Sequence, residues 1–403
     1  MIKKCRICNS RKLFKVLDLG SQPWGNNFLK KFEIGKEKFY PLELMYCNNC
    51  SLVQLSHTVK KETMFSDHTY LSGITKTVSN HFKMICSNIN KQFNYNNSKK
   101  SILDLGSNDG TFLKHFKNIG WDILGIESSK RISIIANKSG IKTINKFFNY
   151  KFALSIKKKF DFINASGVFF HLEELHSFTR GVKYLLANDG VFIVQFLYMK
   201  SIVNNLAFDQ IYHEHLLYYN LTTLQKILYM HDLEIFDCYL TSVHGGQMIT
   251  YISHRGTKTK TKRFFSYLKK EKNSKCNSKS FYLDFAKNIL KLKEKNIKFL
   301  KDCKRNGKVV FGMGAPVKGN TLLNYFNINK NLIPKLLEKN QLRKNLYAPG
   351  SHIPIVMENE EKNIPDVYYV LAWNFKKEIL KNNKKLINSG VKFFFPINPK
   401  NNL

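Results

Sequence analysis

The sequence predicts an α/β protein with two Rossmann-like units and a small metal-binding module in front of them. Three observations carry this prediction: short apolar stretches alternate with amphipathic helices from Ser101 onward, the alternation starts again at Lys308, and two Cys-x-x-Cys pairs lie near the N-terminus. Strands that alternate with helices indicate a parallel sheet covered by helices on both faces. We expect a zinc-binding module at 1–70, a first α/β domain at 71–255 and a second at 256–403.

The cysteine pairs at the N-terminus indicate one structural metal site. Cys5 and Cys8 form the first pair and Cys47 and Cys50 the second, and each pair can sit on a tight turn whose thiolates point at one ion. Four thiolates give closed tetrahedral coordination, which favours zinc and leaves no position open for a substrate. A redox role is the alternative, but the pairs lack a thioredoxin-like context. The spacing therefore predicts a structural zinc ion.

The first α/β unit is expected to begin with a strand at 101–105, and the apolar periods that follow give its later elements. We predict, in order, a helix at 111–118, strands at 122–126 and 160–165, a helix at 173–186 and a strand at 190–196. The run ends near His254. Residues 255–280 are rich in Lys, Thr and Ser with little apolar periodicity, so a linker or the approach to a long helix is expected there.

The second α/β unit follows a charged helix at 283–303. It opens with a strand at 308–312 and continues through the turn Gly314–Gly319 into a helix. Later strands are expected at 367–372 and 391–395.

The chain of 403 residues carries a formal net charge of +36, which by itself would suggest nucleic acid, a phosphorylated substrate or an acidic membrane as partner. The excess comes mostly from Lys spread along the chain, Arg is scarce, and no helix-turn-helix or RNP-like motif is present, so nucleic acid is not expected. No apolar segment follows Met1, and the longest apolar stretch, 190–199, is too short to span a bilayer. A cytoplasmic protein without a membrane partner is expected, and its oligomeric state is left open.

The turn after the first strand has the composition of a cofactor site. Gly106 and Gly110 let the backbone approach a ligand, whereas the acidic side chains of this turn would repel a phosphate. Glu127 ends the next strand, where its carboxylate can accept hydrogen bonds from both hydroxyls of a ribose. S-adenosylmethionine satisfies both demands, since it carries an adenosine and a methionyl amine. The predicted cofactor-binding residues are Asp104, Gly106, Ser107, Asn108, Gly110 and Glu127, with caps at strand ends as the alternative.

The segment Tyr212-His213-Glu214-His215 has the composition of a proton-transfer site. Imidazole titrates near neutrality, and a neighbouring carboxylate or phenol can tune or orient it, so the cluster suits abstraction of a proton from carbon or oxygen. A metal site is the rival: His213 and His215 at i and i+2 would lie on the same side of a strand, whereas zincins space two His at i and i+4 of a helix. An ordinary polar turn is the remaining alternative.

Several separated motifs resemble, in the same order, those of the sugar C-methyltransferases, a family that acts on nucleotide-linked 4-keto-deoxysugars. The likeness covers nearly the whole chain. After the four-cysteine module it comprises 17–23, 104–110, 209–215, 244–246, 314–325, 349–355 and 372–374. The resemblance implies a class I methyltransferase sheet followed by a second Rossmann-like domain, with S-adenosylmethionine and structural zinc as cofactors and a nucleotide sugar as substrate.

Transferred residue by residue, the family's active-site groups fall on Tyr70, His171, Tyr212, Glu214 and His215. The resemblance implies that His215 removes the proton next to the keto group and that Glu214 orients or charges the imidazole network. His171 or Tyr212 would then donate a hydrogen bond to the enolate oxygen. Attack of the enolate carbon on the methyl group would place the branch at C3.

Three further residues of the matched motifs, His244, Lys318 and Asn320, are assigned to the substrate. Lys318 stands before a helix, and a Lys together with a helix N-terminus suits a diphosphate, although a surface lysine is the alternative. The chain also departs from the family's pattern, with Gln195 where an acidic residue is common and Gln247 where a serine is common.

Two other functions stay open. One is methylation of an oxygen on a sugar or small metabolite by the same cofactor fold. The other, suggested by the charge of +36, is a zinc-containing RNA-binding protein or RNA methyltransferase.

Overall fold

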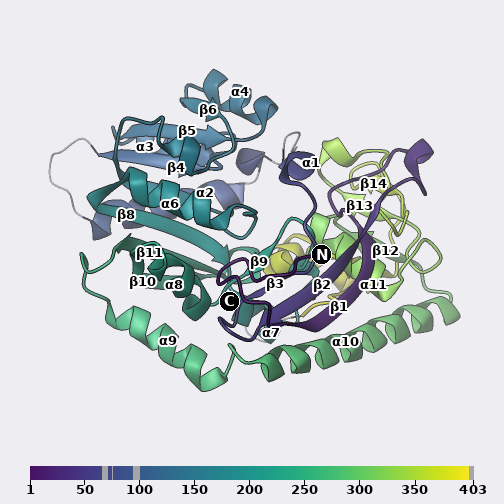
Figure 1. Cartoon of the computed structure of the whole chain (residues 1–403). Helices are drawn as coiled ribbons and strands as arrows, with labels where there is room; N and C mark the ends of the chain where they lie inside the picture. The colour runs from purple at the N-terminus through teal and green to yellow at the C-terminus, as the bar shows by residue number, and fades with distance from the viewer. Residues whose placement is uncertain (66–70, 75, 94–99, 399–403) are drawn as a thin grey trace.

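The computed structural model describes residues 1–65, 71–74, 76–93 and 100–398, and their strands form three sheets (Figure 1). In Figure 1 the central sheet lies on the left and the C-terminal sheet on the right. The N-terminal strands β1 and β2 lie between them, and the helices α9 and α10 run along the lower edge of the molecule. None of the helices in the described residues is long and apolar enough to cross a membrane.

The central sheet has the strand order β10-β11-β8-β7-β4-β5-β6. The strands from β8 to β6 are parallel, and β11 runs antiparallel to both of its neighbours. All five residues of β4 are buried, as expected for a strand covered on both faces. The strands are β4 (Ser101–Leu105), β5 (Asp122–Glu127), β6 (Thr143–Asn145), β7 (Phe160–Ser166), β8 (Leu186–Leu197), β10 (Leu233–Thr241) and β11 (Gln247–His254).

Helices cover both faces of this sheet, and alternate residues of β4 pack into two separate apolar clusters. Ile102 packs with residues of α2 (Lys76–Gln92), α3 (Thr111–Lys117) and α4 (Lys130–Lys138). Leu103 packs with residues of α5 (Tyr150–Ala153), α6 (Leu175–Leu185) and α8 (Leu221–Tyr229). Sheets of this kind bind their ligands at the edge formed by the carboxyl ends of the parallel strands.

The N-terminal sheet is antiparallel, with the order β1-β2-β3-β9. Three strands come from the start of the chain, but the fourth, β9, comes from its middle and directly follows the Tyr212–His215 segment. The backbone N–H of Leu55 also donates to the carbonyl oxygen of Leu216. The candidate proton-transfer segment is therefore tied to the N-terminal sheet. The strands are β1 (Leu13–Pro23), β2 (Phe39–Cys47), β3 (Val53–Leu55) and β9 (Leu217–Tyr218).

The C-terminal sheet is parallel throughout, with the order β14-β13-β12-β15-β16. Its strands are β12 (Val310–Met313), β13 (Leu336–Glu338), β14 (Ile355–Met357), β15 (Val367–Val370) and β16 (Lys392–Phe394). Helix α10 (Lys279–Arg305) leads into this sheet. The remaining helices are α1 (Lys61–Phe65), α7 (Met199–Asn204), α9 (Lys262–Ser274), α11 (Val317–Phe326), α12 (Lys376–Asn382) and α13 (Lys384–Asn388).

The α/β fold class and its two Rossmann-like sheets are confirmed. The strands predicted at 101–105, 122–126 and 160–165 correspond to β4, β5 and β7 within one residue at each end. Half of the region 255–280 is helix α9, and the long helix α10 begins at its end, so the region is the approach to a long helix and not a linker. Thr261 caps α9 by accepting from the backbone N–H of Phe264. Only Phe264 and Glu271 of this helix are buried, and its apolar residues end at Leu268, so its second half gives no apolar signal.

Candidate active site

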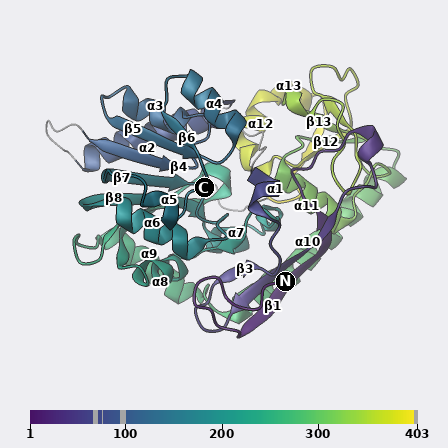
Figure 2. The same cartoon turned by 45° about the horizontal axis from the view of Figure 1, so that its top comes forward.

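A cavity of about 700 Å³ opens at the carboxyl edge of the central sheet, and all three parts of the chain line it. Asn26 and Phe28 come from the N-terminal part, Glu127 and His171 from the central domain, and Arg343 from the C-terminal domain. In the view of Figure 2, α1 lies between the central sheet and α11. The cavity is therefore completed by segments far apart in the sequence.

One half of the cavity has the features of an adenosine site. Glu127 ends β5 and lines the cavity, and its carboxylate accepts from the backbone N–H groups of Asn108 at 2.9 Å and Ser129 at 2.8 Å. Burial raises the pKa of Glu127, although these backbone donors oppose the effect. Gly106 lines the same end with a φ of +74°, and a Cβ there would lie 2.5 Å from Cγ2 of Val168. A fixed acceptor beside a bare backbone turn fits the ribose and adenine of S-adenosylmethionine.

Of the predicted cofactor residues, Gly106, Asn108 and Glu127 line the cavity, whereas the other three lie outside its lining. Asp104 is buried and accepts from the Asn164 amide at 2.7 Å, and burial raises its pKa to about 7. The Ser107 hydroxyl is buried beneath the turn, with no hydrogen bond to any described residue. Gly110 has a φ of +79° at the start of α3, where a Cβ would lie 2.8 Å from the Ile141 side chain.

The other half of the cavity holds the imidazoles. His171 follows β7, and its Nδ1 donates to the backbone carbonyl oxygen of Glu214. His215 donates from Nδ1 to the carbonyl oxygen of Gln210 at 2.7 Å. Because a carbonyl can only accept, each neutral ring carries its proton on Nδ1 and its basic lone pair on Nε2. The two ring centroids are 5.1 Å apart, and the Tyr212 ring lies 3.9 Å from that of His215.

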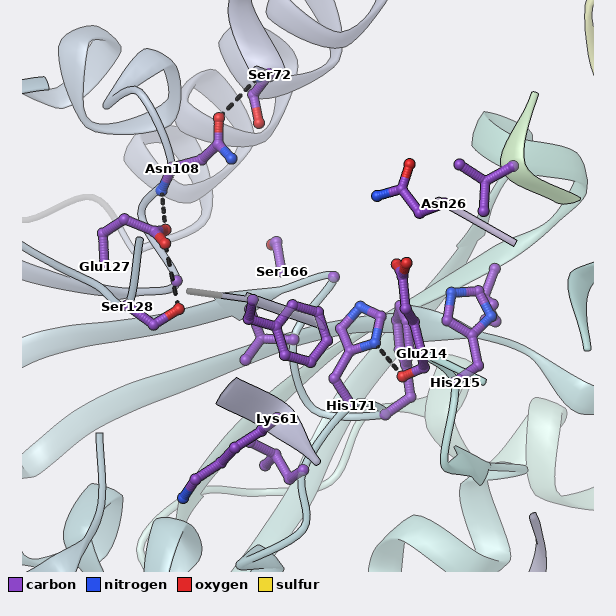
Figure 3. A pocket seen from close by; sticks show the side chains of 18 of the residues that line it. Asn26, Lys61, Ser72, Asn108, Glu127, Ser128, Ser166, His171, Glu214 and His215 are labelled. Atoms are coloured by element: carbon purple, nitrogen blue, oxygen red, sulfur yellow. Dashed lines mark hydrogen bonds between the residues drawn. The ribbon is translucent and has the colours of Figure 1, made fainter. Parts of the chain in front are cut away.

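Glu214 lies between the two imidazole rings in Figure 3, with its carboxylate pointing into the same space. Its side chain is 5% exposed, and the indole Nε1 of Trp24 donates to it at 2.8 Å. Burial raises the pKa of Glu214 to about 7, and the hydrogen bond from Trp24 opposes this rise. A carboxyl group that titrates near neutrality beside two imidazoles can exchange a proton with them.

The structure does not bring His213 to this group. The segment Tyr212–His215 is a turn before β9 and not a strand, so its side chains do not alternate as expected. His213 is 1% exposed, outside the cavity lining, and its Nε2 lies 3.3 Å from the carbonyl oxygen of Tyr40. Burial lowers its pKa to about 4. The two histidines therefore do not converge on a metal, which removes the ground for that alternative.

Of the predicted substrate residues that the structure describes, one lines the cavity and one does not. Lys318 lines the cavity, with its Nζ 3.6 Å from Oδ2 of Asp209 and 3.8 Å from the Trp373 ring centroid. Asn320 is buried outside the cavity lining and donates to the carbonyl oxygen of Gly25 at 2.7 Å. The side chain of His244 and the whole of Tyr70 lie outside the described residues.

Sequence reasoning missed several polar groups at the cavity wall. His81 and Gln195 share a hydrogen bond of 3.0 Å, and the Gln195 amide donates to the Gln247 side chain. Arg343 donates to Glu338 at 3.0 Å and lies 4.5 Å from the Phe28 ring centroid. The two glutamines were visible only as departures from the family pattern. No local signal distinguishes Arg343 or Trp24.

The four cysteines of the N-terminal part form one cluster. Their sulfur atoms all lie within 4.8 Å of one another, with 3.5 Å between Cys5 and Cys50 and 3.6 Å between Cys8 and Cys47. Four sulfurs at about 2.3 Å from a zinc ion would be about 3.8 Å apart, so the cluster fits tetrahedral zinc. It is separate from the cavity, which agrees with a structural role. In the part of the chain that the structure describes, no other group of His, Cys, Asp and Glu is arranged to hold a metal.

Three family models match the chain one after another. Family models match in order: "Putative zinc binding domain" at residues 5–65, "Methyltransferase domain" at 78–237 and "C-methyltransferase C-terminal domain" at 242–398. The C-methyltransferase NovU of Streptomyces niveus is 27% identical over 402 residues, which cover 98% of this chain and 96% of that one.

Solved structures are similar to the chain over less than half of its length. Magnesium protoporphyrin IX methyltransferase from Synechocystis PCC 6803 with bound S-adenosylmethionine is 13% identical, covers 43% of this chain and 78% of its own, and has a TM-score of 0.34. An S-adenosylmethionine-dependent methyltransferase from Clostridium acetobutylicum ATCC 824 is 14% identical, with coverages of 44% and 92% and a TM-score of 0.36. At these scores the likeness carries no argument.

The matched domains and the full-length relative agree with the cavity, whose one half suits an adenosine and whose other half holds titratable side chains. The protein is an S-adenosylmethionine-dependent methyltransferase with a zinc-binding module at its N-terminus, and it is similar over nearly its whole length to a C-methyltransferase.

Proposed function

We propose that this enzyme methylates carbon C3 of a nucleotide-linked 4-keto-deoxysugar. The observation that carries the proposal is the layout of this cavity. In Figure 3, Asn108 and Glu127 lie on one side and His171, Glu214 and His215 on the other, with Ser166 between them. A methyl donor at the first side and a ketosugar at the second would meet within one enclosed space, which favours transfer by proximity.

A hydrogen on the carbon next to a ketone is acidic enough for a positioned base, because the charge left behind spreads onto oxygen. His215 is the proposed base, since its bond to Gln210 leaves the Nε2 lone pair as the basic one. The C–H bond breaks, the proton passes to Nε2, and the electron pair is shared between the carbon and the carbonyl oxygen. S-adenosylmethionine supplies an electrophilic methyl group, to which this carbon forms its new bond as the methyl–sulfur bond breaks.

The enolate oxygen requires a hydrogen-bond donor, and His171 and Tyr212 are the two candidates. His171 has its Nδ1 proton engaged by the Glu214 carbonyl, so its Nε2 can donate only when the ring is protonated. Glu214, ionised and close by, would stabilise that imidazolium form. Tyr212 can donate its phenolic proton without any change of charge. The proposed task of Glu214 is therefore to stabilise the imidazolium form of His171 as a donor, whereas His215 enters the reaction as a neutral base.

The diphosphate of the substrate is proposed to lie toward the C-terminal domain. Lys318 and Arg343 both line the cavity there, and Lys318 is in the first turn of α11. Asp209 and Glu338 neutralise part of their charge, so each cation is held in place before a ligand arrives. A held cation with a helix N-terminus nearby suits a phosphate group.

The test is mass spectrometry of a panel of nucleotide-linked 4-keto-6-deoxyhexoses after incubation with enzyme and S-adenosylmethionine in deuterated water. A methyl-sized mass gain, assigned by fragmentation to C3, would support the proposal and identify the substrate. A methyl ether without exchange of a carbon-bound proton would instead indicate O-methylation. If cofactor-binding enzyme produces neither methyl gain nor deuterium uptake across the panel, the proposal fails, and salt-dependent binding of RNA oligonucleotides becomes the next measurement.

A further inference from the structure

The segment from Asp209 to His215 is held at both ends by indole rings from outside the central domain. At its start, Nε1 of Trp373 in the C-terminal domain donates to Oδ2 of Asp209 at 2.7 Å. At its end, Nε1 of Trp24 donates to Oε1 of Glu214 at 2.8 Å, across 190 positions of sequence. Both carboxylates are buried, with exposures of 0% and 5%. The catalytic segment is thus clamped between the two flanking domains.

Trp24 influences the ionisation of Glu214 more than Trp373 influences that of Asp209, because the two carboxylates differ in their other neighbours. Asp209 also has the ammonium group of Lys318 at 3.6 Å. Within the described residues, no cation and no second hydrogen bond reaches the carboxylate of Glu214. A buried carboxylate with a single donor depends on that donor for both its orientation and its ionisation.

Trp24 itself is anchored on both sides. Pro23, the last residue of β1, pairs with Phe39 of β2, the strand that ends at Cys47. On the other side, the carbonyl oxygen of Gly25 accepts from the buried amide of Asn320. A Cβ on Gly25 would lie 3.2 Å from the carbonyl oxygen of Val317, so the chain passes close to α11 here. The indole is therefore positioned by the zinc module on one side and by the C-terminal domain on the other.

We infer that Trp24 is a positioning residue for catalysis: its indole N–H fixes the orientation of Glu214 and favours the ionised form of its carboxylate. The N-terminal module then contributes directly to the active site, and zinc supports catalysis through β1 and β2. The catalytic consequence rests on the proposed function, but the control of Glu214 by Trp24 does not. Among the described residues, the titratable groups that surround Glu214 are His171 from the loop after β7, and Tyr212 and His215 of its own segment.

The chain contains three tryptophans, so labelling their indole nitrogens with ¹⁵N gives three assignable resonances. We expect the Trp24 resonance to move with pH near neutrality and this movement to disappear in Glu214→Gln. The indole N–H of Trp373 donates to Asp209 instead. Its resonance should therefore respond to pH in Glu214→Gln as it does in the wild type. A Trp24 resonance that is indifferent both to pH and to Glu214→Gln would overturn the inference without any reference to activity.

The kinetic test compares Trp24→Phe, which keeps a ring and removes the N–H donor, with Trp121→Phe. Trp121 packs between Phe116 and Phe162, away from the cavity. Trp24→Phe should lower kcat by about ten- to a hundredfold and leave KM for S-adenosylmethionine nearly unchanged. The acid limb of the pH profile should move upward by about one unit, since loss of the donor raises the pKa of Glu214 further. Trp121→Phe should match the wild type.

The possible outcomes separate the two proposals. Normal kcat and an unchanged acid limb in Trp24→Phe would overturn the inference even if methyl transfer is found. If no substrate of the panel is methylated but the Trp24 resonance still follows Glu214, the proposed function fails and the control of Glu214 by Trp24 stands. Equal loss of activity in Trp24→Phe and Trp121→Phe would show a general effect of tryptophan loss and would also overturn the inference.

Discussion

Nδ1 of His215 donates a hydrogen bond to the backbone carbonyl oxygen of Gln210 at 2.7 Å, and this bond fixes which nitrogen of the ring can act as a base. With the proton held on Nδ1, the basic lone pair is on Nε2. His215→Asn should therefore lower methyl transfer by about 10²-fold or more, because the amide keeps a donor but has no basic nitrogen. Binding of S-adenosylmethionine, measured by calorimetry, should stay near the wild-type value.

A matched control for this substitution is His213→Asn. His213 stands two residues earlier, but it lies outside the cavity lining, beside Tyr40. We expect this variant to retain kcat within a few-fold. Loss of both methyl transfer and cofactor binding in His215→Asn would contradict the role of His215 as a base.

The pH dependence of methyl transfer should show an acid limb from Glu214. Burial raises the pKa of this carboxyl to about 7, and the mechanism needs its ionised form. Activity should therefore rise as the pH increases through about 7 and level off above it. The measurement is kcat against pH in the wild type and in Glu214→Gln. The variant should be less active and should lack this limb, whereas an unchanged limb would assign the titration to another group.

The sequence predicted those parts of the fold that depend on local pattern. The strand β4 and the turn after it could be placed because the apolar residues end at Leu105 and glycines follow at 106 and 110. The strands β6, β13 and β14 were not predicted, because each has three residues, too few for an apolar period to identify it. The equally short β16 could be predicted only because it lies in the aromatic run Phe393–Phe395.

The candidate site was predictable in composition but not in geometry. His171, Glu214 and His215 were named from the sequence, and the structure gathers them at one cavity. The orientation of each ring depends on backbone carbonyls, at Glu214 and Gln210, that no side-chain pattern reveals. The contact of Trp24 with Glu214 joins two domains, so it exists only once the whole chain has folded.

Glu127 should set the affinity for the methyl donor. Its carboxylate is held by the backbone N–H groups of Asn108 and Ser129 at the adenosine end of the cavity. Glu127→Ala should weaken binding of S-adenosylmethionine by about ten- to a hundredfold, the range for hydrogen bonds to a charged group. Isothermal titration calorimetry would measure this directly, with the exposed Asp189→Asn as the control. Unchanged affinity in Glu127→Ala would place the adenosine elsewhere.

Zinc should be required for the folding of the N-terminal module and, through it, for activity. Elemental analysis should find one zinc per chain, since the four sulfur atoms form one cluster. Cys47→Ser, which alters the end of β2, should lose zinc and lower the Tm, because metal binding at such a site contributes to folding. Cys86→Ser is the matched control, because Cys86 is an isolated cysteine in α2 and its substitution should leave the zinc content at one.

Activity should fall together with zinc content when a chelator is titrated into the wild type, since β1 and β2 position Trp24 beside Glu214. Full activity in zinc-depleted enzyme would show that the module holds its shape without the metal.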